Sequence, residues 1–265
     1  MTPSPASFAL KDVVDGFRRL DVVWYLAYDD LRGRFRRTVL GPLWVALANL
    51  VFILGVGFVF SQVFQADLAG FLIYLAAGMA PWALFSSIVA EAPQLFVRSK
   101  TLFETYPLPW SVTVLRSLIG HSLVFTIHLT VFFLLALGFG ASFSLSALLA
   151  IPGVLALIAS GYGLGLGLGV LGARFRDLGP AIGAVLPFLF ILTPIFWRVS
   201  DLGGSRPAVT HFNPIFHYID AIRSPLIGET VDPMTWQFVG VGAVLCLAFG
   251  LGLYARWRRH LYYWL

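Results

Sequence analysis

The sequence predicts an all-α, polytopic membrane protein with six transmembrane helices, an N-terminal amphipathic interface helix and short periplasmic re-entrant helices before the last span. Two observations carry this prediction: the composition is strongly apolar, and long stretches of the chain carry no charge. Of the 265 residues, 58% are hydrophobic and 12% are charged, whereas a soluble domain has about 25% charged residues. A net charge of only +5 and a single cysteine argue against a nucleic-acid-binding protein and a disulfide-rich scaffold, and the apolar content argues against disorder.

The uncharged stretches locate the spans, because a transmembrane helix needs about 20 consecutive, mostly apolar residues. These stretches are 38–66, 68–90, 117–173, 178–197 and 233–255. The longest has room for two helices and divides at a small-residue turn, Gly138–Ser142. The predicted spans are about 42–64, 71–90, 116–137, 146–171, 181–197 and 236–255. The fifth is the shortest and contains Pro187 and Pro194, so we expect it to be kinked or broken.

The distribution of Lys and Arg predicts the orientation, because these residues accumulate in cytoplasmic loops. With the N-terminus inside, only Arg198, Arg206 and Arg223 of the 18 Lys and Arg residues fall in outside segments. Both termini are therefore expected in the cytoplasm, in a multi-pass protein of the cytoplasmic (inner) membrane. Residues 1–37 carry many charges and no apolar core, which is unlike a signal peptide.

The N-terminal segment 1–41 is predicted to be an amphipathic helix and linker ahead of the transmembrane domain 42–265. Its apolar residues recur at helical spacing: Leu10, Val13, Val14, Phe17, Leu20 and Trp24. Charged residues lie between them, as in helices that lie in the plane of the membrane interface. The alternative is a helix packed on a soluble domain, and the sequence offers no such domain.

The outside segment 198–235 is predicted to contain short interfacial or re-entrant helices. Ile215, Ile219, Ile222 and Leu226 keep helical spacing there, and prolines and a glycine interrupt the stretch.

A glycine series lies inside the fourth span: Gly161, Gly163, Gly165, Gly167, Gly169 and Gly172. It contains the letters of a dinucleotide-binding fingerprint, but that motif requires a strand before it and a helix opening at it. Glycines four apart in a span let helix backbones approach closely. We therefore interpret the series as a packing surface.

Energy coupling within this chain is disfavoured by two absences in the sequence. A phosphate-binding loop needs Gly-Lys-Ser/Thr, yet the lysines, Lys11 and Lys100, follow Leu10 and Ser99. The span interiors have no Asp or Glu, since Glu91 falls at the inner end of the second span. His121 and His128 share one face of the third span, where they form either a relay or metal site or, as we favour, interhelical hydrogen bonds.

Aromatic residues gather toward the outer ends of the first and fifth spans: Phe58, Phe60, Phe64, Phe188, Phe190, Phe196 and Trp197. If they face lipid or a neighbouring helix, they are ordinary apolar contacts, which is the favoured interpretation. If they face a pore, they offer flat surfaces for the apolar faces of sugar rings.

Three strings resemble ABC-2 type permeases that export polysaccharides, the family of O-antigen, capsule, teichoic acid and galactan exporters. Arg34–Trp44 (RFRRTVLGPLW) is similar to the family's segment before the first span. Arg174–Leu178 (RFRDL) is similar to the family's second inside motif, and Asn213-Pro214 followed by Arg223 resembles the periplasmic segment before its last span. The six-span layout covers essentially the whole chain.

The resemblance implies a homodimer that works with two copies of a separate ABC ATPase, which binds ATP and Mg²⁺ while this chain binds no cofactor and is no enzyme. It also implies a polyprenyl-diphosphate-linked glycan as substrate, membrane lipids as neighbours and no nucleic acid. Residues 1–41 are similar to the family's gate helix. The residues expected at the entrance for the lipid carrier are Trp24, Arg32, Arg34, Arg36, Arg37 and Trp44. Attraction to anionic lipid headgroups accounts equally well for these arginines.

The inside segment 94–110 resembles the family's coupling helix, which docks into the ATPase, and a solvated charged turn is the alternative. Its candidate coupling residues are Arg98, Lys100, Glu104, Tyr106 and Pro107. A second, smaller contact is expected at Arg174, Arg176 and Asp177.

The expected function is therefore that of the transmembrane subunit of an ATP-driven exporter of a lipid-linked, O-antigen-like polysaccharide. One alternative is an ABC-2 exporter of a drug or small lipid. The other is an ion-coupled carrier, which the lack of acids in the spans disfavours.

Overall fold

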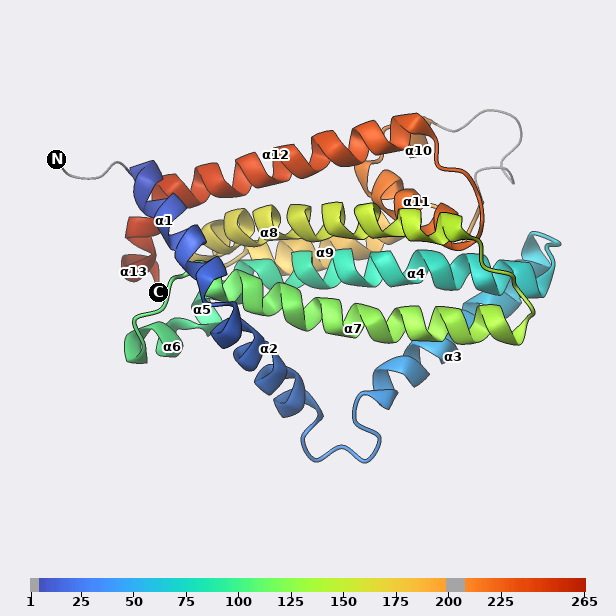
Figure 1. The fold of residues 1–265 in the computed structure, drawn as a ribbon, viewed down its shortest axis with the longest axis horizontal. Coiled ribbons are helices and arrows are strands. Elements are labelled where there is room, and N and C mark those ends of the chain that lie inside the picture. The colour runs from blue at the N-terminus through green and yellow to red at the C-terminus, as the bar shows by residue number, and fades with distance from the viewer. Residues whose placement is uncertain (1–4, 199–207) are drawn as a thin grey trace.

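The computed structural model describes residues 5–198 and 208–265, and in this part of the chain every regular element is a helix. Long helices lie side by side, and the N- and C-terminal elements meet at one end of the molecule (Figure 1). The principal helices are α1 (Pro5–Arg18), α2 (Leu20–Phe35), α3 (Leu43–Val63), α4 (Leu68–Glu91), α7 (Ser111–Gly138), α8 (Ala150–Arg174), α9 (Leu178–Leu192), α11 (Pro214–Leu226) and α12 (Pro233–Trp257). The shorter helices are η1 (Ala92–Gln94), α5 (Leu95–Arg98), α6 (Lys100–Thr105), η2 (Leu145–Leu149), α10 (Ala208–His211), η4 (Arg258–His260) and α13 (Leu261–Trp264).

Five helical segments of the described chain are long and apolar enough to cross a membrane. They are Leu43–Val63, Leu68–Thr105, Ser111–Gly138, Leu145–Arg174 and Pro233–Trp264. Each contains one of the predicted spans or nearly coincides with it, so these five predictions are confirmed as apolar helices. The protein is therefore a multi-pass membrane protein.

The fifth predicted span is shorter than expected. The helix α9 has 15 residues, which at 1.5 Å per residue gives about 22 Å against a hydrocarbon thickness of about 30 Å. It ends before Thr193, which is extended (φ −94°, ψ 130°) because it precedes Pro194. The prediction of a helix over 181–197 is wrong at its C-terminal end, and the expected break is confirmed.

The glycines of α8 are a packing surface, as predicted. A Cβ atom on Gly163 would overlap the backbone of Cys246 on α12, and one on Gly172 would overlap the backbone of Pro93 in η1. A side chain at Gly169 would crowd the ring of Phe96 on α5. Close backbone approach in a membrane bundle requires such small residues.

The N-terminal segment forms two helices where one was expected. The chain breaks at Arg19, whose φ of −104° and ψ of 33° are not helical. The helix α1 packs against α7 and α12, whereas α2 leans away from the bundle and the chain returns to it through α3 (Figure 1). Five of the six residues on the predicted apolar face are exposed, namely Leu10, Val14, Phe17, Leu20 and Trp24, and Val13 is buried.

The predicted helix in segment 198–235 is confirmed as α11, which packs against α4, α8 and α12. Asn213 caps it, because its side-chain oxygen accepts from the backbone amides of Ile215 (3.0 Å) and Phe216 (3.4 Å). Ile215, Ile219 and Ile222 are buried. Arg206 of this segment lies outside the described residues.

Candidate functional site

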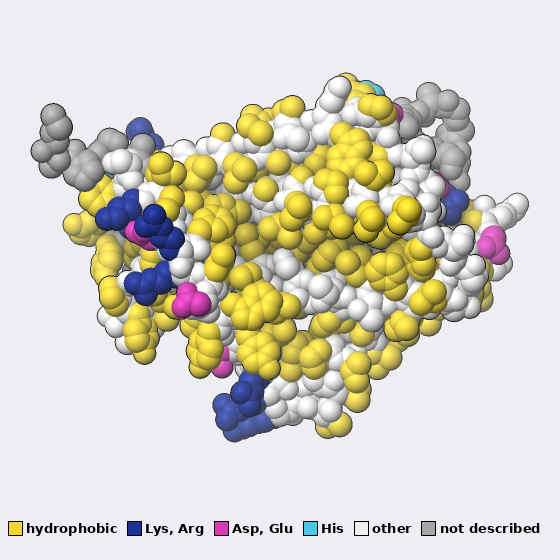
Figure 2. Space-filling model, in the orientation of Figure 1, with side chains coloured by type: hydrophobic (Ala, Val, Ile, Leu, Met, Phe, Trp, Pro, Cys, Tyr) yellow, Lys and Arg dark blue, Asp and Glu magenta, His cyan; other side chains and the backbone are white. Residues whose placement is uncertain are grey.

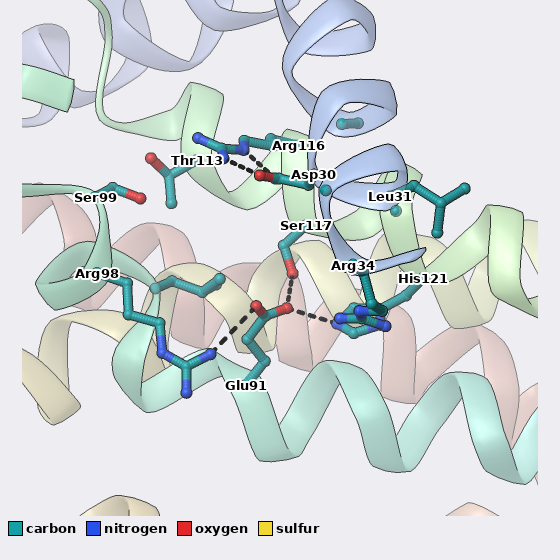
Figure 3. A pocket seen from close by; sticks show the side chains of 14 residues that line it. Asp30, Leu31, Arg34, Glu91, Arg98, Ser99, Thr113, Arg116, Ser117 and His121 are labelled. Carbon is teal, nitrogen blue, oxygen red and sulfur yellow. Dashed lines mark hydrogen bonds and ion pairs between the residues drawn. The ribbon is translucent and has the colours of Figure 1, made fainter. Parts of the chain in front are cut away.

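A cavity of about 520 Å³ lies beneath α2, at the end of the bundle that carries both described chain ends (Figure 3). Its walls come from α2, α4, α5 and α7. The charged or titratable residues that line it are Asp30, Arg34, Glu91, Arg98, Arg116 and His121. Basic and acidic groups from four helices therefore meet in one polar space beside the apolar bundle.

Glu91 contacts three other side chains that line this cavity. Its carboxylate accepts a hydrogen bond from Ser117 Oγ at 2.6 Å and lies 2.6 Å from His121 Nε2 (Figure 3). Arg98 on α5 approaches the other carboxylate oxygen at 3.8 Å. The sequence pattern did not indicate that Glu91 on α4 would be the partner of His121 on α7. The favoured role, an interhelical hydrogen bond, is confirmed for His121.

A second ion pair joins α2 to the bundle across the same cavity. Arg116 on α7 donates from Nε and Nη2 to the two carboxylate oxygens of Asp30. A two-bonded pair of this kind fixes orientation as well as distance. It holds the C-terminal half of α2 over the start of α7.

The four arginines expected at the entrance do not converge on one site. Arg34 lies one helical turn after Asp30 and sits beside His121 in Figure 3. It lines the 520 Å³ cavity and also a second cavity of about 470 Å³ that reaches His128. Arg32 and Arg36 line a separate hollow of about 700 Å³. Arg37 lies in the turn between α2 and α3, with a φ of 68°.

The two tryptophans expected at the entrance are both exposed, Trp24 by 53% and Trp44 by 52%. Trp24 is on α2 and Trp44 is in the first turn of α3, so they flank the linker from opposite sides.

The candidate channel aromatics separate into two groups. Phe60, Phe64, Phe190 and Phe196 form a chain of ring contacts, with centroids 5.0 Å apart for Phe60–Phe196, 5.5 Å for Phe190–Phe196 and 5.9 Å for Phe60–Phe64. Phe60, Phe190 and Phe196 line an apolar groove of about 650 Å³ between α3, α4 and α9. Phe58 and Phe188 point outward and are 59% and 61% exposed.

Trp197 is half-buried just beyond the end of α9. Its indole N–H donates to the backbone oxygen of Ile191 at 3.3 Å, which folds the extended segment back onto the helix.

The candidate coupling segment forms two short helices, α5 and α6, at the end of the bundle that carries the termini. Lys100 pairs with Glu104 at 3.8 Å. Glu104, Tyr106 and Pro107 are exposed. Arg98 is exposed as well, and its guanidinium approaches Glu91 at the cavity. The segment therefore combines residues that face outward with one, Arg98, that contacts Glu91 in the cavity.

The second candidate contact, the turn after α8, lies beside the C-terminal helix α13. Arg176 donates to the backbone oxygen of Trp264 at 3.3 Å, and the guanidinium of Arg174 lies 5.5 Å from the Trp264 ring. Asp177 is exposed.

At the opposite end of the bundle, a buried arginine was not predicted as a site residue. Arg223 on α11 is 3% exposed, donates to the backbone oxygen of Pro194 at 2.7 Å and lies 4.2 Å from the ring centroid of Tyr74. The break after α9 leaves that oxygen without a helical partner, and Arg223 satisfies it. Only the spacing after Asn213-Pro214 pointed to this residue.

No group of three or more metal-ligating side chains occurs within residues 5–198 and 208–265.

Residues 21–227 match the family described as ABC-2 type transporter. The chain is 23% identical over 239 residues to the O-antigen export system permease protein RfbA of Klebsiella pneumoniae, covering 88% of this chain and 91% of the relative. It is 23% identical over 231 residues to the polysialic acid transport protein KpsM of Escherichia coli, covering 85% and 89%. It is also 22% identical over 192 residues to an RfbA of Myxococcus xanthus, covering 72% and 74%.

Proposed function

The chain belongs to the ABC-2 type transporter family, and from this premise we propose that it is the permease subunit of an ATP-driven exporter of a lipid-linked polysaccharide. Its relatives are named for O-antigen export and polysialic acid transport, and they match over most of the chain. The family implies work with an ABC ATPase. We place ATP and Mg²⁺ on two copies of that ATPase, and two copies of this chain around the path.

The proposed topology has six spans, with the short helix α9 as the fifth, and both termini in the cytoplasm. Figure 2 shows hydrophobic side chains over the flank of the bundle, and dark-blue Lys and Arg side chains mainly at the end near α1 and at the tip between α2 and α3. This separation supports a protein of the cytoplasmic membrane with its basic end inside. The helices α1 and α2 would lie at the inner interface, and α11 would be the outer re-entrant helix.

The observation that carries the proposal is the polar cavity beneath α2. It joins basic side chains to a helix that also exposes the aromatic residues Trp24, Tyr25 and Tyr28. A polyprenyl diphosphate likewise joins a multivalent anion to an apolar chain. Arg34 has no hydrogen bond or ion pair with any described residue, so its guanidinium is free to bind an anion. Arginine suits phosphate because its planar fork donates two parallel hydrogen bonds.

The glycan would follow the lipid head along the aromatic cluster of α3 and α9. The rings of Phe60, Phe190 and Phe196, which contact one another at tilted angles, present flat apolar surfaces that tolerate different sugars. A second copy of the chain would close the open side of the groove. A polymer that must slide is better served by many weak contacts than by a few strong ones.

A complementation experiment tests the proposal. Cells that lack the permease should retain the lipid-linked glycan on the cytoplasmic side, and this chain expressed with its cognate ATPase should restore glycan at the cell surface. An ATPase variant that binds but does not hydrolyse ATP is the control and should not restore export. Transport of solute by the purified chain in liposomes without any ATPase would contradict the proposal.

A further inference from the structure

The C-terminal helix α13 lies between the two segments proposed to receive the ATPase. From one side, Lys100 Nζ on α6 donates to the backbone oxygen of Leu265 at 2.8 Å. From the other side, Arg176 donates to the backbone oxygen of Trp264, and Arg174 lies over the Trp264 ring. Cations at the last carbonyl groups of a helix are favourable. The two segments are far apart in the sequence, and α13 joins them.

The inner side of α13 is firmly packed. Leu261 is fully buried, and the Trp264 ring lies 5.5 Å from Trp257 and 5.7 Å from the ring of His260. Tyr262 meets Trp110 edge-on at 5.8 Å, and Trp110 in turn packs on Phe103 of α6 at 3.9 Å. A displacement of α6 would therefore be passed to α13 through aromatic contacts as well as through Lys100.

Two tyrosines of α13 are exposed, although one edge of Tyr262 also contacts Trp110. Tyr262 is 69% exposed and Tyr263 is 86% exposed, and Tyr106 at the end of α6 is 57% exposed. Tyrosine is enriched at protein interfaces, because it combines a large apolar ring with a hydroxyl group. These tyrosines share the end of the bundle with exposed residues of both charges, namely Lys100, Glu104, Arg174, Arg176 and Asp177.

We infer that α13 is a third part of the surface that receives the ABC ATPase, and that it holds the α6 segment and the 174–177 turn so that they move together. Tyr262 and Tyr263 contact the partner, and Trp264 is a positioning residue, because its ring holds α13 against Arg174, Trp257 and His260. The inference rests on the proposed function. It deepens that function, because it names residues beyond the coupling segments that engage the ATPase.

The test uses the full-length permease in nanodiscs, titrated with its separately purified cognate ATPase. The double variant Y262A/Y263A should weaken ATPase binding about tenfold or more, as expected for aromatic anchors of an interface. The control is Leu145→Ala, which removes an 85% exposed apolar side chain at the opposite end of the bundle and should bind like the unmodified chain. Equal melting temperatures for the variants will show that the fold is kept.

A second variant, Trp264→Ala, separates positioning from contact. It leaves both tyrosines in place, so we expect the ATPase to bind less than threefold more weakly while ATP hydrolysis no longer rises with export. Normal binding and normal coupling in both variants would overturn the inference. If the unmodified chain binds no ATPase, the proposed function fails; if it binds and exports while Y262A/Y263A binds equally well, only the inference fails.

Discussion

The helices α1 and α2 follow one another in the chain and differ in how they are held. In α1, a single buried carboxylate makes four contacts that fix the helix to the bundle. In α2, the charges lie at the surface or line cavities, and one ion pair reaches the bundle. The comparison separates charges that build the fold from charges that remain available to a ligand.

The attachment of α1 to the bundle depends on Asp12, whose side chain is 1% exposed. Its carboxylate accepts from the backbone amides of Trp110 (3.2 Å) and Ser111 (3.0 Å), from the Tyr254 hydroxyl (2.8 Å) and from Arg258 Nη2 (2.5 Å). It thereby satisfies amides at the N-terminus of α7, where a negative charge is favourable. A buried charge is tolerated because it is fully paired.

The helix α2 is attached less firmly. Among the described residues, its one ion pair with the rest of the bundle joins Asp30 to Arg116. Arg32, Arg34 and Arg36 make no ion pair with described residues. These charges add little to stability, and they are free to exchange solvent for an anion.

Removing the buried carboxylate of Asp12 should have the largest effect. Asp12→Ala leaves Arg258 and two helix-terminal amides without their partner, which should cost about 3–5 kcal/mol of the free energy of unfolding. We expect loss of the monodisperse protein in detergent, measured by size-exclusion chromatography and thermal unfolding. Asp15→Ala, at a partly exposed position on the same helix, is the control, and equal damage by both variants would contradict a special role for Asp12.

Removing the charge of Glu91, in the cavity beneath α2, should have the next largest effect. Glu91→Gln keeps the size of the side chain but removes the charge shared by His121 and Arg98. We expect export to fall at least tenfold with a loss of about 1–3 kcal/mol in stability, the range for a disturbed buried hydrogen-bond partner. Export and thermal unfolding, measured on the same preparations, check this. A fall in export that merely follows the amount of folded protein would assign Glu91 a structural role only.

Removing an unpaired charge from α2 should lower transport without changing the stability of the fold. Arg34→Ala should lower export several-fold, because it removes the unpaired guanidinium between two cavities, while the melting temperature stays within error. Arg34→Lys should recover part of the activity, since it keeps the charge but loses the planar fork. Arg37→Ala is the matched control outside those cavities, and an identical loss from it would mean that only general surface charge matters.

The smallest overall effect is expected from the ion pair that joins α2 to α7. Asp30→Asn weakens a pair in which the aspartate side chain is 51% exposed, and such pairs contribute about 0–1 kcal/mol. We expect nearly unchanged thermal unfolding, together with faster hydrogen exchange in α2 and unchanged exchange in α1. Unchanged exchange in both helices would show that α2 is held by its apolar contacts instead.

The buried face of α1 could not be identified from its apolar pattern. That pattern predicted which side of the helix faces the acyl chains, and it did not indicate which residues pack against the bundle. The packed residues are Ala9, Asp12, Val13 and Gly16, which share one helical face of small side chains. A side chain at Gly16 would collide with Ser111, so this face permits close approach. In lipid, the larger apolar residues face outward, and the small-residue stripe is the signal that marks the contact.

The same rule explains α3. Its buried residues are Asn49, Ile53, Gly57 and Ser61, four apart and mostly small or polar, while Val51, Leu54 and Phe58 are exposed. Hydropathy identified this helix correctly and gave no information about which side packs. Periodicity of small and polar residues would have done so.

The sequence by itself determined the helical class, the positions of the apolar helices, the break before Pro194 and the glycine surface of α8. These depend on properties of short segments: apolar length, missing amide hydrogens and missing side chains. Only the tertiary structure decided the pairs Asp12–Arg258, Glu91–His121, Asp30–Arg116 and Arg223 with Pro194, and the position of α13 between the α6 segment and the 174–177 turn. Their partners are brought together by helix packing across long separations in the chain, and no local pattern records which distant group a buried charge will meet.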